Sequence, residues 1–99
     1  MYTLEFSEMV AEHLGELRAF DRKQVLNQID AQLTHQPTVE TRNKKKLVGL
    51  SPPWEHVNPV WELRVGEFRV FYDVDEEESR VVVCAIRRKP PHKTTEEIL

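Results

Sequence analysis

The chain has 99 residues, of which 39% are hydrophobic and 31% are charged, and its formal net charge is −3 at pH 7. This composition predicts a single domain, residues 1–99, with a small core and a water-exposed surface, and no apolar run is long enough to cross a bilayer. The only cysteine, Cys84, excludes an intramolecular disulfide. Because residues 1–4 also lack signal-peptide character, the sequence predicts a cytoplasmic protein.

The first residues predict a strand that leads into a helix. Residues 2–6 alternate polar and apolar side chains, which is typical of a short strand. Ser7 is expected to cap a first helix through its hydroxyl oxygen. The spacing of Val10, Leu14 and Leu17 then places one apolar stripe along that helix.

A second helix is expected to begin at Asp21. Asp21 and Gln24 resemble a capping box, and Phe20 can pack against Val25 as a hydrophobic staple. Pro37 is expected to end this helix. Its buried stripe is predicted to consist of Val25, Leu26, Ile29 and Leu33.

Residues 38–59 are predicted to form a loop, because Pro52, Pro53 and Pro59 interrupt them and no periodicity is visible. The loop carries a basic run at residues 42–46. Two interpretations are open for its three lysines: a solvated surface segment, or cations that bind phosphate. They are Lys44, Lys45 and Lys46.

Residues 60–72 predict a two-stranded hairpin with a turn at Gly66 and Glu67, because glycine at the first central position favours a type II′ turn. Counting outward from the turn places Arg64 opposite Arg69 on one face. The other face is predicted to join the core and consists of Trp61, Leu63, Val65, Phe68, Val70 and Tyr72. Like charges that face each other across two strands are destabilising, so the arginine pair suggests a negative partner.

The C-terminal part predicts one more strand and a tail. Residues 80–86 are almost continuously apolar, which indicates a central strand buried on both faces, and an acidic turn at residues 75–79 precedes it. Pro90 and Pro91 end the strand. Residues 90–99 are expected to form either a mobile tail or a short helix capped by Thr94 and Glu97. The predicted fold is α+β, in the order β-α-α-β-β-β: a small twisted, mostly antiparallel sheet with a helical hairpin on one face.

The sequence contains no residue pattern typical of a metal site or of a glycine-rich phosphate-binding loop. The four histidines are isolated from one another, there is one cysteine, and the three glycines form no phosphate-binding loop. No cofactor or metal is therefore expected. Cys84 is a poor candidate nucleophile, because an apolar strand raises the pKa of a thiol.

Basic side chains are expected to gather around the sheet face that carries Arg64 and Arg69. The further members of this predicted set are Lys44, Lys45, Lys46, Arg87, Arg88, Lys89 and His92. Guanidinium groups suit phosphate, and cleavage of an RNA phosphodiester needs cations, a base and an acid. A surface salt-bridge cluster of Glu62 with the two arginines is the alternative interpretation.

The pattern of residues 61–74, preceded by residues 42–47 and by a strand plus a helical hairpin, resembles the RelE/ParE superfamily of type II toxin–antitoxin toxins. The resemblance covers nearly the whole chain and implies the fold of that superfamily. It also implies that most RelE-like members cut mRNA on the ribosome without a metal, whereas ParE-like members inhibit DNA gyrase. A cognate antitoxin neutralises both kinds.

The resemblance implies roles for individual residues. Arg69 matches a recurrent phosphate-binding arginine, and Arg64 matches a basic position on the preceding strand. Glu62 stands where some relatives have lysine. Lys45 and Lys46 fall near a loop position that supplies a carboxylate base in some relatives.

At the end of the last strand, relatives often have an arginine followed by a histidine or tyrosine that acts as the acid. Here Arg88 and Lys89 are followed by two prolines, and the nearest histidine is His92. The phosphate-holding half of the family site is therefore recognisable, and the acid–base half is not.

The leading hypothesis is a RelE-like endoribonuclease whose partners are an antitoxin, mRNA and the ribosome. Arg64 and Arg69 would hold the scissile phosphate, Glu62 or Lys46 would be the base, and Lys89 or His92 the acid. Two alternatives stay open: a ParE-like inhibitor of DNA gyrase that is not a nuclease, and a toxin fold kept only as an interaction module.

Overall fold

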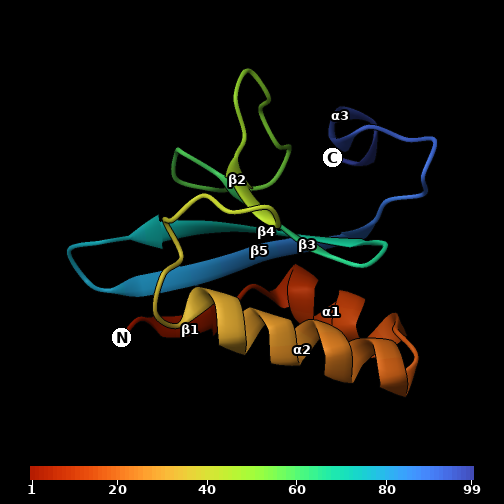
Figure 1. Ribbon diagram of the computed structural model, residues 1–99, viewed down its shortest axis with the longest axis horizontal. Coiled ribbons are helices and arrows are strands. Elements are labelled where there is room, and N and C mark those ends of the chain that lie inside the picture. The colour runs from red at the N-terminus through yellow and green to blue at the C-terminus, as the bar shows by residue number, and fades with distance from the viewer.

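The computed structural model describes residues 1–99 and contains one five-stranded sheet in the order β1-β5-β4-β3-β2. The elements are β1 (Thr3–Phe6), α1 (Glu8–Glu16), α2 (Ala19–Leu33), β2 (Lys44–Lys46), β3 (Trp61–Val65), β4 (Phe68–Asp75), β5 (Arg80–Arg88) and α3 (Thr95–Ile98). Helices α1 and α2 cover one face of the sheet, and residues 47–59 and α3 lie over the other (Figure 1). None of the helices combines the length and the hydrophobicity that a membrane span requires.

The β3–β4 hairpin has the predicted register, from Val65 opposite Phe68 to Trp61 opposite Tyr72. Gly66 has a φ of +57°, the positive value that the first central position of a type II′ turn needs. All six side chains predicted for the core face belong to the main hydrophobic core. The α+β fold with a helical hairpin on one face is therefore confirmed.

Strand β5 lies between β1 and β4 and is buried on both faces, as predicted for a continuous apolar run. Val81 and Val83 point into the main core, whereas Cys84 and Ala85 belong to a second, smaller cluster on the other side. The pairing of β1 with β5 is parallel, so the sheet is antiparallel everywhere except at this edge.

The second hydrophobic cluster was not predicted. Residues 47–59 carry Trp54 across the sheet, where its ring lies 5.4 Å from that of Phe71. The Val57 amide donates to the buried Asp73 carboxylate at 2.9 Å and so fixes the same segment to β4. This cluster covers part of the face that also carries the arginine pair.

Helix α2 begins two residues earlier than predicted, at Ala19, and its N-cap residue Arg18 makes no side-chain capping bond. The Phe20 side chain is 77% exposed, so the predicted staple is wrong. A tertiary contact fixes this turn instead: Arg22 donates to the Leu14 and Leu17 carbonyls at the end of α1, at 2.8 and 2.9 Å.

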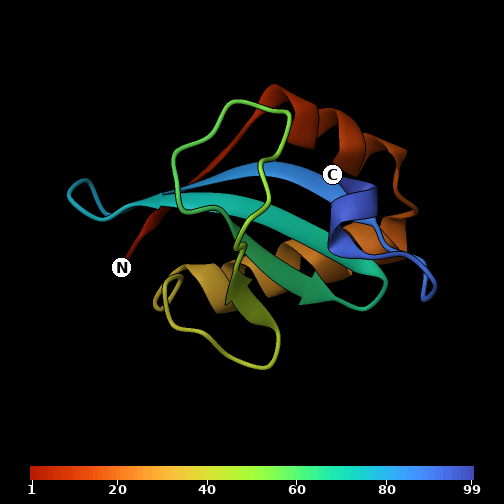
Figure 2. The same cartoon turned by 90° about the horizontal axis from the view of Figure 1, so that it is seen from above.

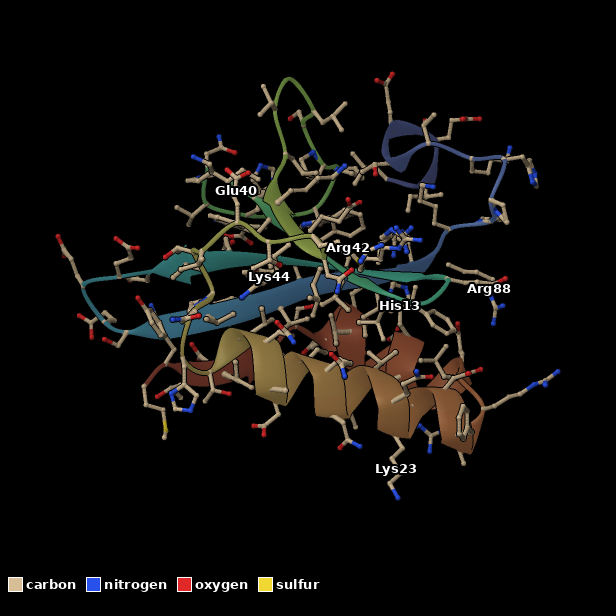
Figure 3. All side chains as sticks on the ribbon, viewed as in Figure 1. His13, Lys23, Glu40, Arg42, Lys44 and Arg88 are labelled. Atoms are coloured by element: carbon tan, nitrogen blue, oxygen red, sulfur yellow. The ribbon has the colours of Figure 1, made fainter.

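Residues 44–46 of the basic run form strand β2 and not a loop, which corrects the prediction for them. Lys44 lies opposite Leu63 and is only 3% exposed. Its Nζ donates to the Gln32 carbonyl in the last turn of α2 at 3.1 Å and to the Gln36 carbonyl just after the helix at 2.7 Å. Figure 3 labels Lys44. Burial lowers the pKa of Lys44. Lys44 therefore caps a helix and does not reach the face that carries the arginine pair.

Replacing Lys44 with methionine should destabilise the protein by about 1–3 kcal/mol, because it removes a buried charged donor from two carbonyl groups and leaves that of Gln36 with only the longer bond from the Val39 amide at 3.4 Å. Equilibrium urea denaturation of Lys44→Met and of the parent measures the difference. The matched variant is Lys46→Met, on the same face of β2, whose side chain is exposed and makes no ion pair; it should change the free energy of unfolding by less than about 0.5 kcal/mol. Equal losses in both variants would contradict the capping role.

Stability should fall at alkaline pH, because burial and the Asp73 carboxylate raise the pKa of Cys84 from 9.0 to about 12. The unfolded chain loses this proton near pH 9 while the folded chain keeps it. The contribution of Cys84 to stability is therefore fully present below pH 9 and is lost as the pH rises toward 12. Burial raises the pKa of Tyr72 in the same sense.

Denaturation curves at several pH values above 9 test this prediction. Cys84→Ala should reduce the steepness of the decline by about 1.4 kcal/mol per pH unit, the contribution of one proton. Lys44 acts in the opposite direction but is common to both proteins, so the difference isolates Cys84. Parallel curves for parent and variant would refute the assignment.

Candidate functional site

A polar cavity of about 230 Å³ lies on the sheet face opposite α1 and α2. It has no hydrophobic lining residue, and five of its side chains are basic while one is a carboxylate. The lining residues are Arg42, Asn43, Lys45, Glu62, Arg64, Arg69, Lys89 and Thr95. The cavity is therefore strongly cationic although the whole chain is acidic.

Arg69 is the cation of the cavity that side-chain hydrogen bonds to the backbone hold in place. Its Nη1 donates to the Gly66 and Phe68 carbonyls, both at 2.9 Å, so the hairpin turn holds the guanidinium in place. Burial lowers the pKa of Arg69, Glu62 raises it and Arg64 lowers it. An arginine stays protonated at neutral pH, and the remaining nitrogens make no hydrogen bond to the chain, so they are available to an anion.

Glu62 supplies the only carboxylate of the cavity and is 4% exposed. Its Oε2 accepts a hydrogen bond from the Thr95 hydroxyl at 2.7 Å. Its Oε1 lies 3.6 Å from Lys45 Nζ, a longer contact with an exposed side chain. Thr95 of α3 thus holds one oxygen, and the other contacts only the exposed Lys45 side chain.

Three arginines form a row across the sheet, because Arg64 lies opposite Arg69 and Arg69 lies opposite Arg87. The Arg87 guanidinium stacks on Trp54, 5.2 Å from its ring centroid, and contacts the ring of His13. None of the three forms an ion pair with a carboxylate. Such a row is costly in the free protein, and a bound anion would offset the repulsion.

The structure brings together five of the predicted site residues in one cavity: Lys45, Glu62, Arg64, Arg69 and Lys89. Arg87 lies beside them in the arginine row but does not line the cavity.

Four predicted residues lie elsewhere. Lys44 and Lys46 point to the opposite face, where they pair with Leu63 and Trp61. Arg88 contacts Glu67 at 3.1 Å and stacks on Phe68, and Figure 3 shows it at the end of the sheet. His92 is exposed in the turn after β5 and lines no part of the cavity.

Sequence reasoning missed Arg42, Asn43 and Thr95. The first two reach the cavity because the Asn43 carbonyl accepts from the Arg64 amide at 2.7 Å and so extends the pairing of β2 with β3. Alternation along residues 43–46, read as a strand, would have placed Asn43 and Lys45 on the Glu62 face. Thr95 comes from α3, and no local pattern indicates where that helix docks.

A model of the family described as the ParE toxin of the type II toxin–antitoxin system parDE matches residues 4–89. No curated protein matches the chain. Among solved structures, the chain is similar to that of an archaeal RelE–RelB complex from Pyrococcus horikoshii, with a TM-score of 0.70 and 20% identity over 94% of this chain and 98% of that one.

Two further structures have the same fold. A chain of the toxin–antitoxin complex RelBE2 from Mycobacterium tuberculosis gives a TM-score of 0.69 at 22% identity and covers 89% of this chain and 98% of its own. The isolated RelE toxin of Escherichia coli matches with a TM-score of 0.63 at 18% identity, and the match covers 98% of this chain and 94% of that one. The family model spans most of the sequence, and the chain therefore belongs to the ParE toxin family of type II toxin–antitoxin systems, within the RelE/ParE superfamily.

Proposed function

We propose that this toxin is a metal-independent endoribonuclease that cleaves mRNA on the ribosome. The observation that supports the proposal is the cavity in which five basic side chains surround the one carboxylate, Glu62. The reaction needs positive charge around the phosphate and a group that can remove a proton beside it. A salt-bridge cluster explains the cavity less well, because Arg64 and Arg69 form no ion pair with Glu62.

In the proposed reaction the Glu62 carboxylate takes the proton of the 2′-hydroxyl. The 2′-oxygen attacks phosphorus, and the bond from phosphorus to the 5′-oxygen breaks. Lys89 donates a proton to the departing 5′-oxygen, which leaves as a hydroxyl, and the other product carries a 2′,3′-cyclic phosphate. Arg64 and Arg69 bind the phosphate oxygens while negative charge accumulates on them.

The positions of the candidates support Glu62 as the base and Lys89 as the acid in this proposal. Lys46 points away from the cavity and His92 does not line it, so Glu62 and Lys89 are the members of each pair that can share one phosphate. Lys45 on β2, with Arg42 and Asn43 just before that strand, also lines the cavity, where these side chains can contact the neighbouring phosphates of an RNA strand.

The proposed protein partner is a cognate antitoxin. Several similar solved structures are complexes of a RelE toxin with a RelB antitoxin, among them those from Pyrococcus horikoshii and Methanococcus jannaschii. An antitoxin that neutralises this chain would either cover the cationic cavity or bind elsewhere and keep the toxin from its target.

The second candidate function is inhibition of DNA gyrase, and the match to the ParE toxin model favours it. The resemblance implies that ParE-like toxins act in this way, without cutting nucleic acid. The cationic cavity would then be a binding surface, and Glu62 would have no catalytic role.

One pair of assays separates the two candidates. The purified toxin is added to ribosomes that are translating a defined mRNA, and the RNA ends are mapped and tested for 2′,3′-cyclic phosphate. Supercoiling by gyrase is measured in parallel with the same preparation. Cleavage with cyclic-phosphate ends and normal supercoiling supports the nuclease, whereas intact mRNA and blocked supercoiling supports the gyrase inhibitor.

A further inference from the structure

Helix α3 delivers one hydroxyl group to the cavity. Thr94 caps the helix, since its side chain accepts from the Glu97 amide at 3.3 Å while the Glu97 carboxylate accepts from the Thr94 amide at 3.0 Å. The next residue, Thr95, is then free to turn its hydroxyl toward the sheet. It donates to Glu62 Oε2 at 2.7 Å, across 33 residues of sequence.

Apolar contacts hold α3 in this place. Ile98 and Leu99 pack against the second hydrophobic cluster, which includes Trp54 of residues 47–59. Pro90 and Pro91 restrict the segment that connects α3 to β5. Figure 2 shows α3 above the end of the sheet where β5 finishes. The hydrogen bond and the apolar contact together fix the position of Thr95 relative to β3.

The Glu62 carboxylate has competing neighbours. Lys45 Nζ is 3.6 Å from Oε1, and Arg69, on the neighbouring strand β4, is diagonally opposite Glu62 and interacts with it electrostatically. With the Thr95 hydroxyl on Oε2, only Oε1 remains for these cations and for a substrate hydroxyl. The Thr95 hydroxyl is neutral and occupies one oxygen without adding positive charge.

We propose that Thr95 is a positioning residue for Glu62, so that the C-terminal helix completes the arrangement that removes the proton. This inference rests on the proposed nuclease function. Thr95 holds Oε2, and Oε1 consequently faces the cavity, where the 2′-hydroxyl of a bound RNA would lie. Thr95 donates its hydroxyl to the base, so its loss should slow the reaction with little change in RNA binding.

The test is single-turnover cleavage of mRNA on programmed ribosomes by the parent, Thr95→Val and Thr95→Ser. The valine variant keeps the shape of the side chain but lacks the hydroxyl, and its maximal rate should fall about tenfold, while the ribosome concentration at half saturation changes by less than about twofold. The serine variant should regain a rate within about threefold of the parent.

A double-mutant cycle identifies the route of the effect. In the Glu62→Gln background, which lacks the proton acceptor, adding Thr95→Val should slow cleavage by less than about twofold, because the hydroxyl acts through the carboxylate. A tenfold further loss would overturn the proposal, as would a Thr95→Ser variant no faster than Thr95→Val.

Thr94→Ala is the matched control for order in the helix, because it removes the cap and leaves the Thr95 hydroxyl in place. A rate nearer the parent's than that of Thr95→Val supports positioning; equal losses would assign the effect to loss of the helix and overturn it. A parent protein that cuts no mRNA would refute the nuclease and, with it, this role. A parent that cuts and a Thr95→Val variant of equal rate would refute only the role of Thr95.

Discussion

Replacing Arg69 with alanine should lower the rate of mRNA cleavage by about 10²–10³-fold, the usual cost of removing one preorganised donor to a charged transition state. Two carbonyl groups of the hairpin turn hold this guanidinium, and its other nitrogens are free to bind phosphate oxygens. Cleavage of mRNA on programmed ribosomes, followed over time for parent and variant, measures the effect.

Arg88→Ala is the control for loss of an arginine near the same end of the sheet. Arg88 is paired with Glu67 and stacked on Phe68, on the opposite face from the cavity, so this variant should cleave at the parental rate. Because Arg69 is largely buried, thermal melting must show that Arg69→Ala is folded at the assay temperature. Equal cleavage by a folded Arg69→Ala variant and the parent would remove Arg69 from the site.

The hairpin could be predicted from the sequence because its determinants are local. Gly66 fixes the turn, the turn fixes the register, and alternation along residues 61–72 then sorts every side chain to one face. The same reasoning placed Arg64 opposite Arg69 and Glu62 on their face. The caps at Ser7 and Thr94 were also predicted, since each bond spans only three residues.

The features that were missed or mistaken depend on contacts between distant segments. The start of α2 is set by Arg22 reaching the end of α1, not by a local capping box. Strand β2 is three lysines long, and only pairing with β3 makes it a strand. Thr95 meets Glu62 across 33 residues because apolar contacts of α3 bring it there, and the sequence holds no periodic signal for that docking.

The net charge of −3 is compatible with an anion-binding site because the charges are segregated. The acidic β4–β5 turn and the β3–β4 turn lie at opposite ends of the sheet (Figure 1). The cationic cavity is lined by Arg64 and Arg69, which flank the β3–β4 turn. The longest dimension of the molecule is 35 Å, whereas screening at physiological salt reduces electrostatic interactions over about 8 Å. A phosphate at the cavity therefore responds chiefly to the nearby cations and not to the total charge.

Trp61→Ala should lower the free energy of unfolding by about 3–5 kcal/mol, the usual cost of truncating a large buried aromatic side chain. Trp61 is 4% exposed, and its ring is stacked on that of Tyr72, with centroids 6.2 Å apart. The pair joins β3 to β4 on the face that α2 covers, so the truncation leaves a cavity where sheet and helix meet. Urea denaturation of parent and variant measures the loss.

Phe20→Ala is the matched aromatic truncation, because the Phe20 side chain is 77% exposed at the start of α2. It should change the free energy of unfolding by less than about 0.5 kcal/mol, as expected for a surface position that makes no core contact. A loss below about 1 kcal/mol in Trp61→Ala would mean that the hairpin register is wrong. Because Arg64 and Arg69 are placed opposite each other by that same register, such a result would also remove the geometric basis of the cationic cavity.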